Sequence, residues 1–372
     1  MDNDSYRQYR NLDLLSEYLH SRIYNGKELF YVFLDEIQFA ISREELKRHD
    51  EPVRLYGILN GLLQLGNVDV YVTGSNSKMM SKDILTEFRG RGDLVEIYPL
   101  SFKEYYDYIG GERTLAYEEY SRFGGMPLVL AQKNEQYKAR YLSSLFDELF
   151  FKDIIERNEI ELPHILSELT DLLCSAVGSL TNVNKIVNTL SSVQNIQVDN
   201  STIGDYLNYL TESFLFKCSK RYDVKGKKYF EYPSKYYCAD VGLRNARLNF
   251  RQQEESHIQE NIIYNELVSR GYSVDVGVMR AEEKDAEGTR HQNTLEIDFV
   301  INSGMKRHYI QSALSMDSPD KANQELRPLL LVKDSFQKIV ISKTLMRPWI
   351  DDRGVLHLGI YDFLLNPKSM DI

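Results

Sequence analysis

Two short apolar runs that end abruptly in polar residues limit the fold of this chain more than any other feature of its sequence. LFYVFLDE (residues 29–36) ends in Asp35 and Glu36, and VDVYVTG (residues 68–74) leads into a series of small polar residues. Such runs, separated by helical patterns, predict neighbouring parallel strands in an α/β sheet. Open α/β sheets bind ligands at the carboxyl ends of their strands, so both polar clusters are expected at one binding edge.

These polar residues have the chemistry of a nucleotide-hydrolysing site. In such sheets, one acid at a strand end holds Mg²⁺ and a second acid beside it orients the attacking water. We expect Asp35 to take the first role and Glu36 the second. The alternative is that one of the two acids caps the following helix. After the second run, Ser75 or Asn76 would contact the γ-phosphate or position the water.

Two arginines follow in the segment FRGRG. The guanidinium groups of Arg89 and Arg91 suit bidentate contact with phosphate, although either could equally be a surface ion-pair partner. Acids, a polar strand end and arginines in this order are more specific for a nucleotide site than any one of them alone.

Composition sets the outer bounds. A chain of 372 residues with 42% hydrophobic and 27% charged residues is typical of a globular protein with two or three domains. We expect a cytoplasmic protein without a membrane partner, because no apolar run approaches the roughly 18 residues of a membrane span. Cys174, Cys218 and Cys238 lack C-x-x-C spacing, which argues against zinc and for reduced thiols. The net charge of −10 disfavours broad nucleic-acid affinity but leaves room for a local basic face.

The patterning predicts an α/β multidomain protein with four parts. An incomplete α/β core is followed by a helical lid or linker, then by helices and a β-hairpin, and finally by a second α/β unit. We place these parts at residues 1–115, 116–160, 161–245 and 246–372.

The third part resembles a winged helix. NVNKIVNTLSSV and NSTIGDYLNYLTESF predict two helices of a helix-turn-helix, but the outward positions of the second are neutral or acidic, unlike a base-reading helix. The hairpin after them carries seven basic against two acidic residues between positions 217 and 235. Such a wing could contact nucleic-acid phosphates without reading sequence, or simply keep an edge strand soluble. The candidate contact residues are Lys220, Arg221, Lys225, Lys227 and Lys228.

The motifs FLDEIQ, TGSNSKMMS, FRGRGDLVEIYPLSFKEYYDY and FGGMP, in this order, resemble the bacterial and archaeal AAA-type ATP-binding proteins that carry a C-terminal domain of unknown function. The resemblance implies that FLDEIQ is the Walker B strand, TGSNS the sensor strand and FRGRG part of an arginine-bearing segment. It also implies an ATPase core that uses ATP and Mg²⁺, a winged-helix-like module, and a C-terminal domain similar to restriction endonucleases.

The sequence departs from that family at the phosphate-binding loop. G-x-x-x-x-G-K-[ST] grips phosphates through its backbone amides and its lysine. Before Asp35 the only glycine is Gly26, in NGKEL, and the other Gly-Lys step, at Gly226, lacks the partner glycine and the hydroxyl. The resemblance therefore implies a chain without its Walker A region. We expect neither tight ATP binding nor hydrolysis, and an in-frame loop encoded upstream of Met1 would favour an ATP-driven protein.

The fourth part has the layout of a metal-dependent nuclease: a helix with Glu260 and Glu266, then a strand with Glu296 and Asp298. By the resemblance, acids from three places hold Mg²⁺ and the lysine of an E-x-K motif on the next strand steadies the attacking water.

That next strand reads YIQSAL, which puts Gln311 at the expected acid and Ala313 at the expected lysine. A neutral amide supplies no charge, and alanine supplies no ammonium. Nuclease activity is therefore not expected. We expect Glu266, Asp298 and Gln311 to persist as a hydrogen-bonded polar cluster.

Two classes of function follow. The first is an ATP-binding protein whose intact form is a nucleotide-driven switch acting on nucleic acid or on a protein partner, with Asp35, Glu36 and Asn76 as remains of its site. The second is a non-enzymatic scaffold that binds DNA or protein through the basic wing and the nuclease-like domain.

Overall fold

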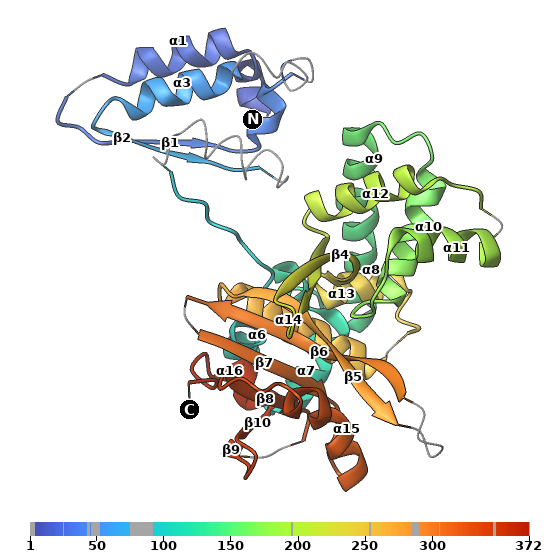
Figure 1. The fold of residues 1–372 in the computed structure, drawn as a ribbon. Helices are drawn as coiled ribbons and strands as arrows, with labels where there is room; N and C mark the ends of the chain where they lie inside the picture. The colour runs from blue at the N-terminus through green and yellow to red at the C-terminus, as the bar shows by residue number, and fades with distance from the viewer. Residues whose placement is uncertain are drawn as a thin grey trace. The chain divides into compact units, whose positions relative to one another are not determined.

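The computed structural model describes residues 4–24, 26–42, 45, 53–74, 92–194, 196–252, 254–284, 290–304, 306–344 and 347–371. The chain divides into two compact units (Figure 1). The first unit comprises Met1–Ile97 with Glu212–Phe214, and the second comprises Tyr98–Thr211 and Leu215–Ile372. Among the helices that the structure describes, none has the length and apolar character needed to cross a membrane.

The first unit is built on two parallel strands, as the sequence predicts. Strand β1 (Phe30–Leu34) pairs with β2 (Val68–Val72) in parallel register, so that both strands end at the same edge. Among the described residues of this unit, the helical elements are η1 (Asp4–Arg10), α1 (Leu12–Arg22), η2 (Ile37–Ala40) and α3 (Arg54–Leu63).

The core of the first unit forms on one face of this sheet. Asn11 caps α1, because its side chain accepts hydrogen bonds from the first turn, and the leucines of α1 and α3 recur at helical spacing. The buried leucines of the two helices pack against Val32 and Leu34; they are Leu12, Leu15, Leu19, Leu55, Leu59 and Leu62. Tyr31 and Phe33 alternate with Val32 and Leu34 on the opposite face and are 57% and 71% exposed.

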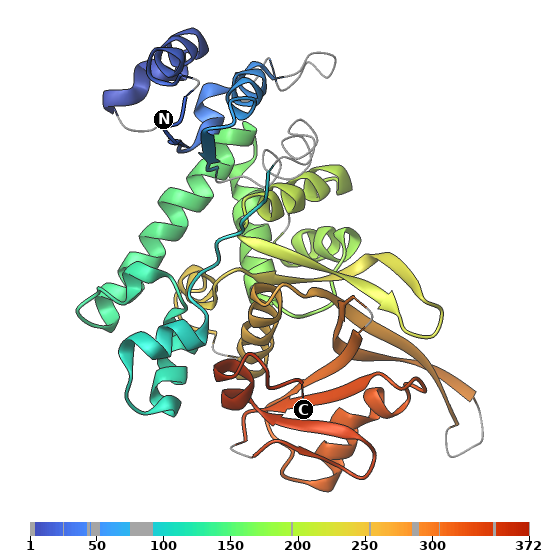
Figure 2. The same ribbon diagram turned by 90° about the vertical axis from the view of Figure 1, so that its left-hand side faces the viewer.

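The second unit is organised around an eight-stranded mixed sheet with the order β4-β3-β5-β6-β7-β8-β10-β9. Figure 2 shows the strands of this sheet in colours from yellow to red. The pairs β3/β5, β7/β8 and β8/β10 are parallel, and the others are antiparallel. The strands are β3 (Phe216–Asp223), β4 (Lys228–Cys238), β5 (Ser273–Lys284), β6 (Arg290–Ser303), β7 (Lys306–Ala313), β8 (Gln337–Ser342), β9 (Trp349–Ile350) and β10 (Val355–Gly359).

Helices cover both faces of this sheet. Helices α6, α7, α14 and α16 share one apolar core with the sheet, α15 packs in a second core on the other face, and α8 to α13 surround a third core that includes residues of β3 and β4. The helical elements are α6 (Phe102–Ile109), α7 (Arg113–Phe123), η3 (Pro127–Val129), α8 (Glu135–Ser144), the π-helical η4 (Leu145–Phe151), α9 (Lys152–Asn158), α10 (Pro163–Ser175), α11 (Val183–Gln194), α12 (Asn200–Glu212), α13 (Val241–Arg247), α14 (Glu255–Ser269), α15 (Pro319–Leu330) and α16 (Ile360–Leu365).

The hairpin predicted as a wing is continuous with the large sheet. Strand β3 pairs with β4 on one side and with β5 on the other, through Arg221 and Val276. The predicted helix, the strand with Glu296 and Asp298, and the next strand are present as α14, β6 and β7, with β5 between α14 and β6. All residues from Tyr98 onward, except Glu212–Phe214, pack as one unit. The predicted division into four parts, and the winged-helix and nuclease-like assignments, therefore stay predictions.

A β-bulge in β6 changes the direction of its side chains. Asp275 pairs with Val300 but Gly277 pairs with Ile297, so β6 has one extra residue opposite β5. A Cβ atom at Gly277 would lie 2.9 Å from the Cβ of Ile297, which leaves room only for glycine. Bulges re-aim side chains next to functional sites, and this one contains Asp298.

Candidate functional site

The structure brings the ends of β1 and β2 into direct contact. The Thr73 hydroxyl donates a hydrogen bond to Asp35 Oδ1 at 2.5 Å and accepts one from the backbone N–H of Glu36 at 3.0 Å. The Asp35 carboxylate and the Thr73 hydroxyl are oxygen groups of the kind that Mg²⁺ takes. They therefore fit the metal that the family resemblance implies, whereas the sequence supplies no loop for the phosphates.

Glu36 does not cap the helix that follows it. It occupies the N-cap position of η2 with φ 51° and ψ 59° and makes no side-chain capping bond. Its carboxylate instead accepts a hydrogen bond from the side chain of Gln38. A left-handed backbone at a non-glycine residue costs on the order of 1–3 kcal/mol and is often found at functional sites.

The other residues predicted for this site lie outside the residues that the structure describes. They are Ser75, Asn76, Arg89 and Arg91. Their predicted contacts with phosphate and water stay predictions.

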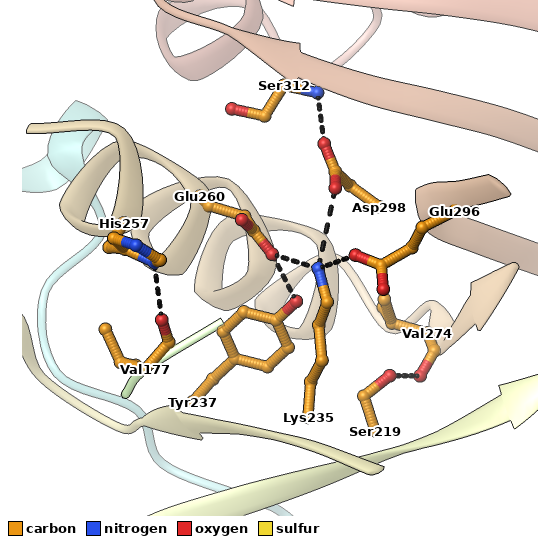
Figure 3. A network of polar contacts seen from close by, with 10 residues as sticks. All are labelled: Val177, Ser219, Lys235, Tyr237, His257, Glu260, Val274, Glu296, Asp298 and Ser312. Atoms are coloured by element: carbon orange, nitrogen blue, oxygen red, sulfur yellow. Dashed lines mark hydrogen bonds and ion pairs between the residues drawn. The ribbon is translucent and has the colours of Figure 1, made fainter. Parts of the chain in front are cut away.

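In the second unit, one buried lysine lies among three acids, which we call the carboxylate cluster: Glu260, Glu296 and Asp298 (Figure 3). Lys235 Nζ lies 2.8 Å from Glu260 Oε1, 2.5 Å from Glu296 Oε1 and 3.5 Å from Asp298 Oδ1. The lysine side chain is only 2% exposed. Its three N–H donors therefore face three carboxylates.

Three different elements contribute these side chains, and further hydrogen bonds fix two of the acids in place. Lys235 comes from β4, Glu260 from α14, and the other two acids from β6 around its bulge. The Tyr237 hydroxyl donates to Glu260 Oε1 at 2.7 Å, and the backbone N–H of Ser312 donates to Asp298 Oδ2 at 2.9 Å. The backbone at Gly178 closes over Glu260, because a Cβ atom there would lie 3.1 Å from the carboxylate.

The electrostatics of the cluster favour a fixed positive charge on the lysine. Burial raises the pKa of Glu260, and the negative charge of Asp298 raises it further. Burial also raises the pKa of Glu296. Burial by itself would lower the pKa of Lys235, but the charges of Glu260, Asp298 and Glu296 outweigh it and raise that pKa above its ordinary value. The ammonium group thus stays protonated.

Glu266 lies apart from this cluster. The sequence analysis grouped it with Asp298, but its carboxylate binds Arg270 Nε at 2.7 Å, one turn along the same helix. Six positions separate it from Glu260, which on an α-helix puts the two side chains on different faces. Glu260 therefore takes the place that was expected for Glu266.

Gln311 and Ala313 lie on β7 as predicted, facing α15. Ala313 packs in the apolar core on that side. Gln311 lies near Glu325 of α15, and burial and the charge of Asp298 raise the pKa of Glu325. Gln311 Oε1 is buried and has no hydrogen-bond partner among the described residues.

Sequence reasoning missed Lys235 because it counted this lysine with the charge of the wing. A signal was present, since Lys235 stands in the run YPSKYYC and is followed by the buried residues Tyr236, Tyr237 and Cys238. A lysine in a buried strand needs carboxylate partners elsewhere in the fold.

The wing keeps part of its positive surface without Lys235. Arg221 lies over the ring of Phe230, 5.0 Å from its centroid, and Lys225 Nζ donates to the carbonyl of Arg280 at 3.0 Å. The exposed lysines of the hairpin are Lys220, Lys225, Lys227 and Lys228.

Comparison with known proteins finds two matching domain families and two similar proteins. The AAA domain family matches residues 1–106, and a domain of unknown function, DUF8612, matches residues 114–254. An uncharacterized protein of Haemophilus influenzae is 32% identical over 366 residues, which cover 97% of this chain and 84% of that protein. An uncharacterized protein of Methanocaldococcus jannaschii is 28% identical over 327 residues, which cover 84% of this chain and 67% of that protein.

Among solved structures, a Vibrio cholerae protein aligns over 96% of this chain and 78% of its own length, with 11% identity and a TM-score of 0.24. So low a score carries no argument about the fold.

The parallel strands and the matching domain define the class: this is a mixed α/β multidomain protein with an AAA domain at residues 1–106. Within that class, the chain belongs to the family that includes the uncharacterized Haemophilus influenzae protein.

Proposed function

We propose that the first unit corresponds to the nucleotide-binding part of a switch, but that this chain, whose sequence has no G-x-x-x-x-G-K-[ST] loop, neither binds ATP tightly nor hydrolyses it. One observation supports the site: Asp35 and Thr73 hydrogen-bond at the shared carboxyl edge of β1 and β2. With a phosphate-binding loop present, Asp35 would hold Mg²⁺ and Glu36 would orient the attacking water, and such a switch would act on nucleic acid or on a protein partner.

The absence of G-x-x-x-x-G-K-[ST] from the sequence sets the expected affinity. Each charge-assisted contact to a phosphate contributes about 1.5–3 kcal/mol, so losing three of them weakens binding by roughly a thousandfold or more. A residual affinity through Asp35 and Mg²⁺ alone would be weaker than millimolar.

Isothermal titration calorimetry of the whole chain with Mg²⁺ and ATP tests this proposal. We expect no measurable heat of binding at nucleotide concentrations up to about 1 mM. A low-micromolar Kd that is lost in Asp35→Asn would contradict it. Asp69→Asn is the matched control, because Asp69 is an exposed acid on β2, away from the strand end.

The second unit favours a further candidate, a binding scaffold that does not cleave nucleic acid. The specific observation is the cation at the centre of the carboxylate cluster, Lys235 Nζ, which makes the cluster a closed ion-pair network. We therefore expect no cleavage of duplex or branched DNA with Mg²⁺ or Mn²⁺. Cleavage that Asp298→Ala abolishes would refute this.

Such a scaffold would contact phosphates through the exposed lysines of the wing. Fluorescence polarisation with a labelled DNA duplex should show binding at about 20 mM salt that weakens steeply toward 200 mM, as counterion release requires. The triple change Lys225→Glu, Lys227→Glu and Lys228→Glu should abolish it. Binding that is absent at low salt would favour a protein partner instead.

A further inference from the structure

The metal that an endonuclease-like fold implies does not fit the second unit. Such a metal would lie among the acids of the helix and the central strand. That position is next to Lys235 Nζ, which lies within 3.5 Å of all three acids of the carboxylate cluster.

We propose that Lys235 is the resident cation of the carboxylate cluster, a covalently tethered substitute for a divalent metal ion. The wild-type cluster consequently has no affinity for divalent cations. Removing the lysine side chain turns the same three carboxylates into a site for a hard cation such as Ca²⁺ or Mn²⁺.

The distances support this exchange. Two of the oxygens lie 2.5 Å and 2.8 Å from Nζ, so a cation at that point would be close to the roughly 2.3–2.6 Å at which Ca²⁺ binds oxygen. Carboxylate oxygens are the ligands that such ions prefer, and water can complete the coordination. Asp298 Oδ1, at 3.5 Å, needs only a small movement to join them.

The cluster is held in place by contacts that do not involve the lysine. Glu260 is fixed by the Tyr237 hydroxyl, and Asp298 by the backbone N–H of Ser312. Those contacts remain when the Lys235 side chain is shortened. Glu260 and Asp298 therefore keep their positions, with Glu296 two residues from Asp298 on β6, and the three charges must be neutralised by protons or by a bound cation.

A cation also has a route into the site. The Glu296 side chain is 31% exposed, whereas those of Glu260 and Asp298 are 13% and 11% exposed. Solvent thus reaches the cluster past Glu296. In the wild-type protein the ammonium group of Lys235 already occupies the place between the carboxylates to which this route leads.

Metal binding to the whole chain tests this inference, and the readout needs neither nuclease nor ATPase activity. Mn²⁺ binding is measured by electron paramagnetic resonance, and the melting temperature of the second unit is measured with and without 10 mM Ca²⁺. Lys235→Ala should bind one Mn²⁺ and gain roughly 5 °C with Ca²⁺, whereas the wild type should change by less than about 1 °C. Lys228→Ala, an exposed lysine of the same strand, is the matched control and should behave as wild type.

Adding Asp298→Asn to Lys235→Ala should abolish the gained binding. The inference is overturned if folded Lys235→Ala binds no Mn²⁺, or if the wild type binds Mn²⁺ in a manner that Asp298→Asn removes. If Lys235→Ala does not fold without metal, its refolding with and without 10 mM Ca²⁺ decides the question. Recovery that depends on Ca²⁺ supports the inference, and equal failure in both conditions overturns it.

Discussion

Replacing Lys235 by methionine removes the cation of the carboxylate cluster while keeping most of the side-chain volume. The wild-type lysine is 2% exposed and faces three carboxylates. Removing one partner of a buried ion pair costs about 3–5 kcal/mol, because it leaves buried charge without compensation. Methionine fills the space flexibly, so the loss of packing adds little. We expect the free energy of unfolding of the second unit to fall by about 3–5 kcal/mol at pH 7.5.

The sign of the pH dependence follows from the shifted pKa values. The raised pKa of Lys235 means that its stabilisation is fully present below the ordinary lysine value and is lost only in strongly alkaline solution. The raised pKa values of Glu260 and Glu296 mean that their ionisation costs stability as the pH rises above the ordinary glutamate value. Without the lysine these carboxylates take up protons more readily. The deficit of Lys235→Met should therefore shrink as the pH falls from 7.5 toward 5.

Urea unfolding followed by tryptophan fluorescence measures this deficit. The chain has a single tryptophan, Trp349, which lies in β9 and reports on the second unit. Lys228→Met is the matched control and should change the unfolding free energy by less than about 0.5 kcal/mol, since Lys228 is exposed. A deficit for Lys235→Met below about 1 kcal/mol at pH 7.5, or one that is equal at pH 5 and 7.5, would refute the reasoning.

Two further predictions concern the packing of the second unit. Asp240 is buried, and its two carboxylate oxygens accept hydrogen bonds from the backbone N–H groups of Gly125, at 2.7 Å, and Leu243, at 3.0 Å. Asp240→Asn should leave one of these N–H groups unpaired. The free energy of unfolding, measured in urea, should therefore fall by about 1–3 kcal/mol. Burial raises the pKa of Asp240 to about 6. Ionisation of Asp240 therefore lowers the stability of the wild type as the pH rises from about 4 to 6. The difference in unfolding free energy between the wild type and Asp240→Asn should thus be larger at pH 4.5 than at pH 7. Gly277→Ala should cost about 1–3 kcal/mol, because its Cβ would lie 2.9 Å from that of Ile297, and a melting temperature equal to wild type would show that the bulge adapts.

The local sequence pattern was sufficient to predict the polar edge where β1 and β2 end in the first unit. Both runs end in polar residues, and parallel pairing of Leu34 with Val72 leads directly to the contact of Asp35 with Thr73. The alternation of buried Val32 with exposed Phe33 follows from the period of a strand.

The local sequence pattern was insufficient to predict the carboxylate cluster, because the cluster depends on strand pairings between distant parts of the chain. Strand β3 pairs with β5, so Arg221 lies beside Val276, and this pairing carries the hairpin and Lys235 into the large sheet. Charge alone placed Lys235 in an exposed wing. The spacing of Glu260 and Glu266 puts the two acids on different faces of α14. The sequence alone does not show which of these faces packs toward the acids of β6.

A crystal structure of the full chain grown with Mn²⁺, with anomalous diffraction data, tests most directly whether the protein itself supplies the cation of the carboxylate cluster. We predict Lys235 Nζ within hydrogen-bonding distance of Glu260 and Glu296, and no anomalous peak among the three acids. A Mn²⁺ ion bound by Glu260 and Asp298, with Lys235 displaced from the site, would contradict the assignment.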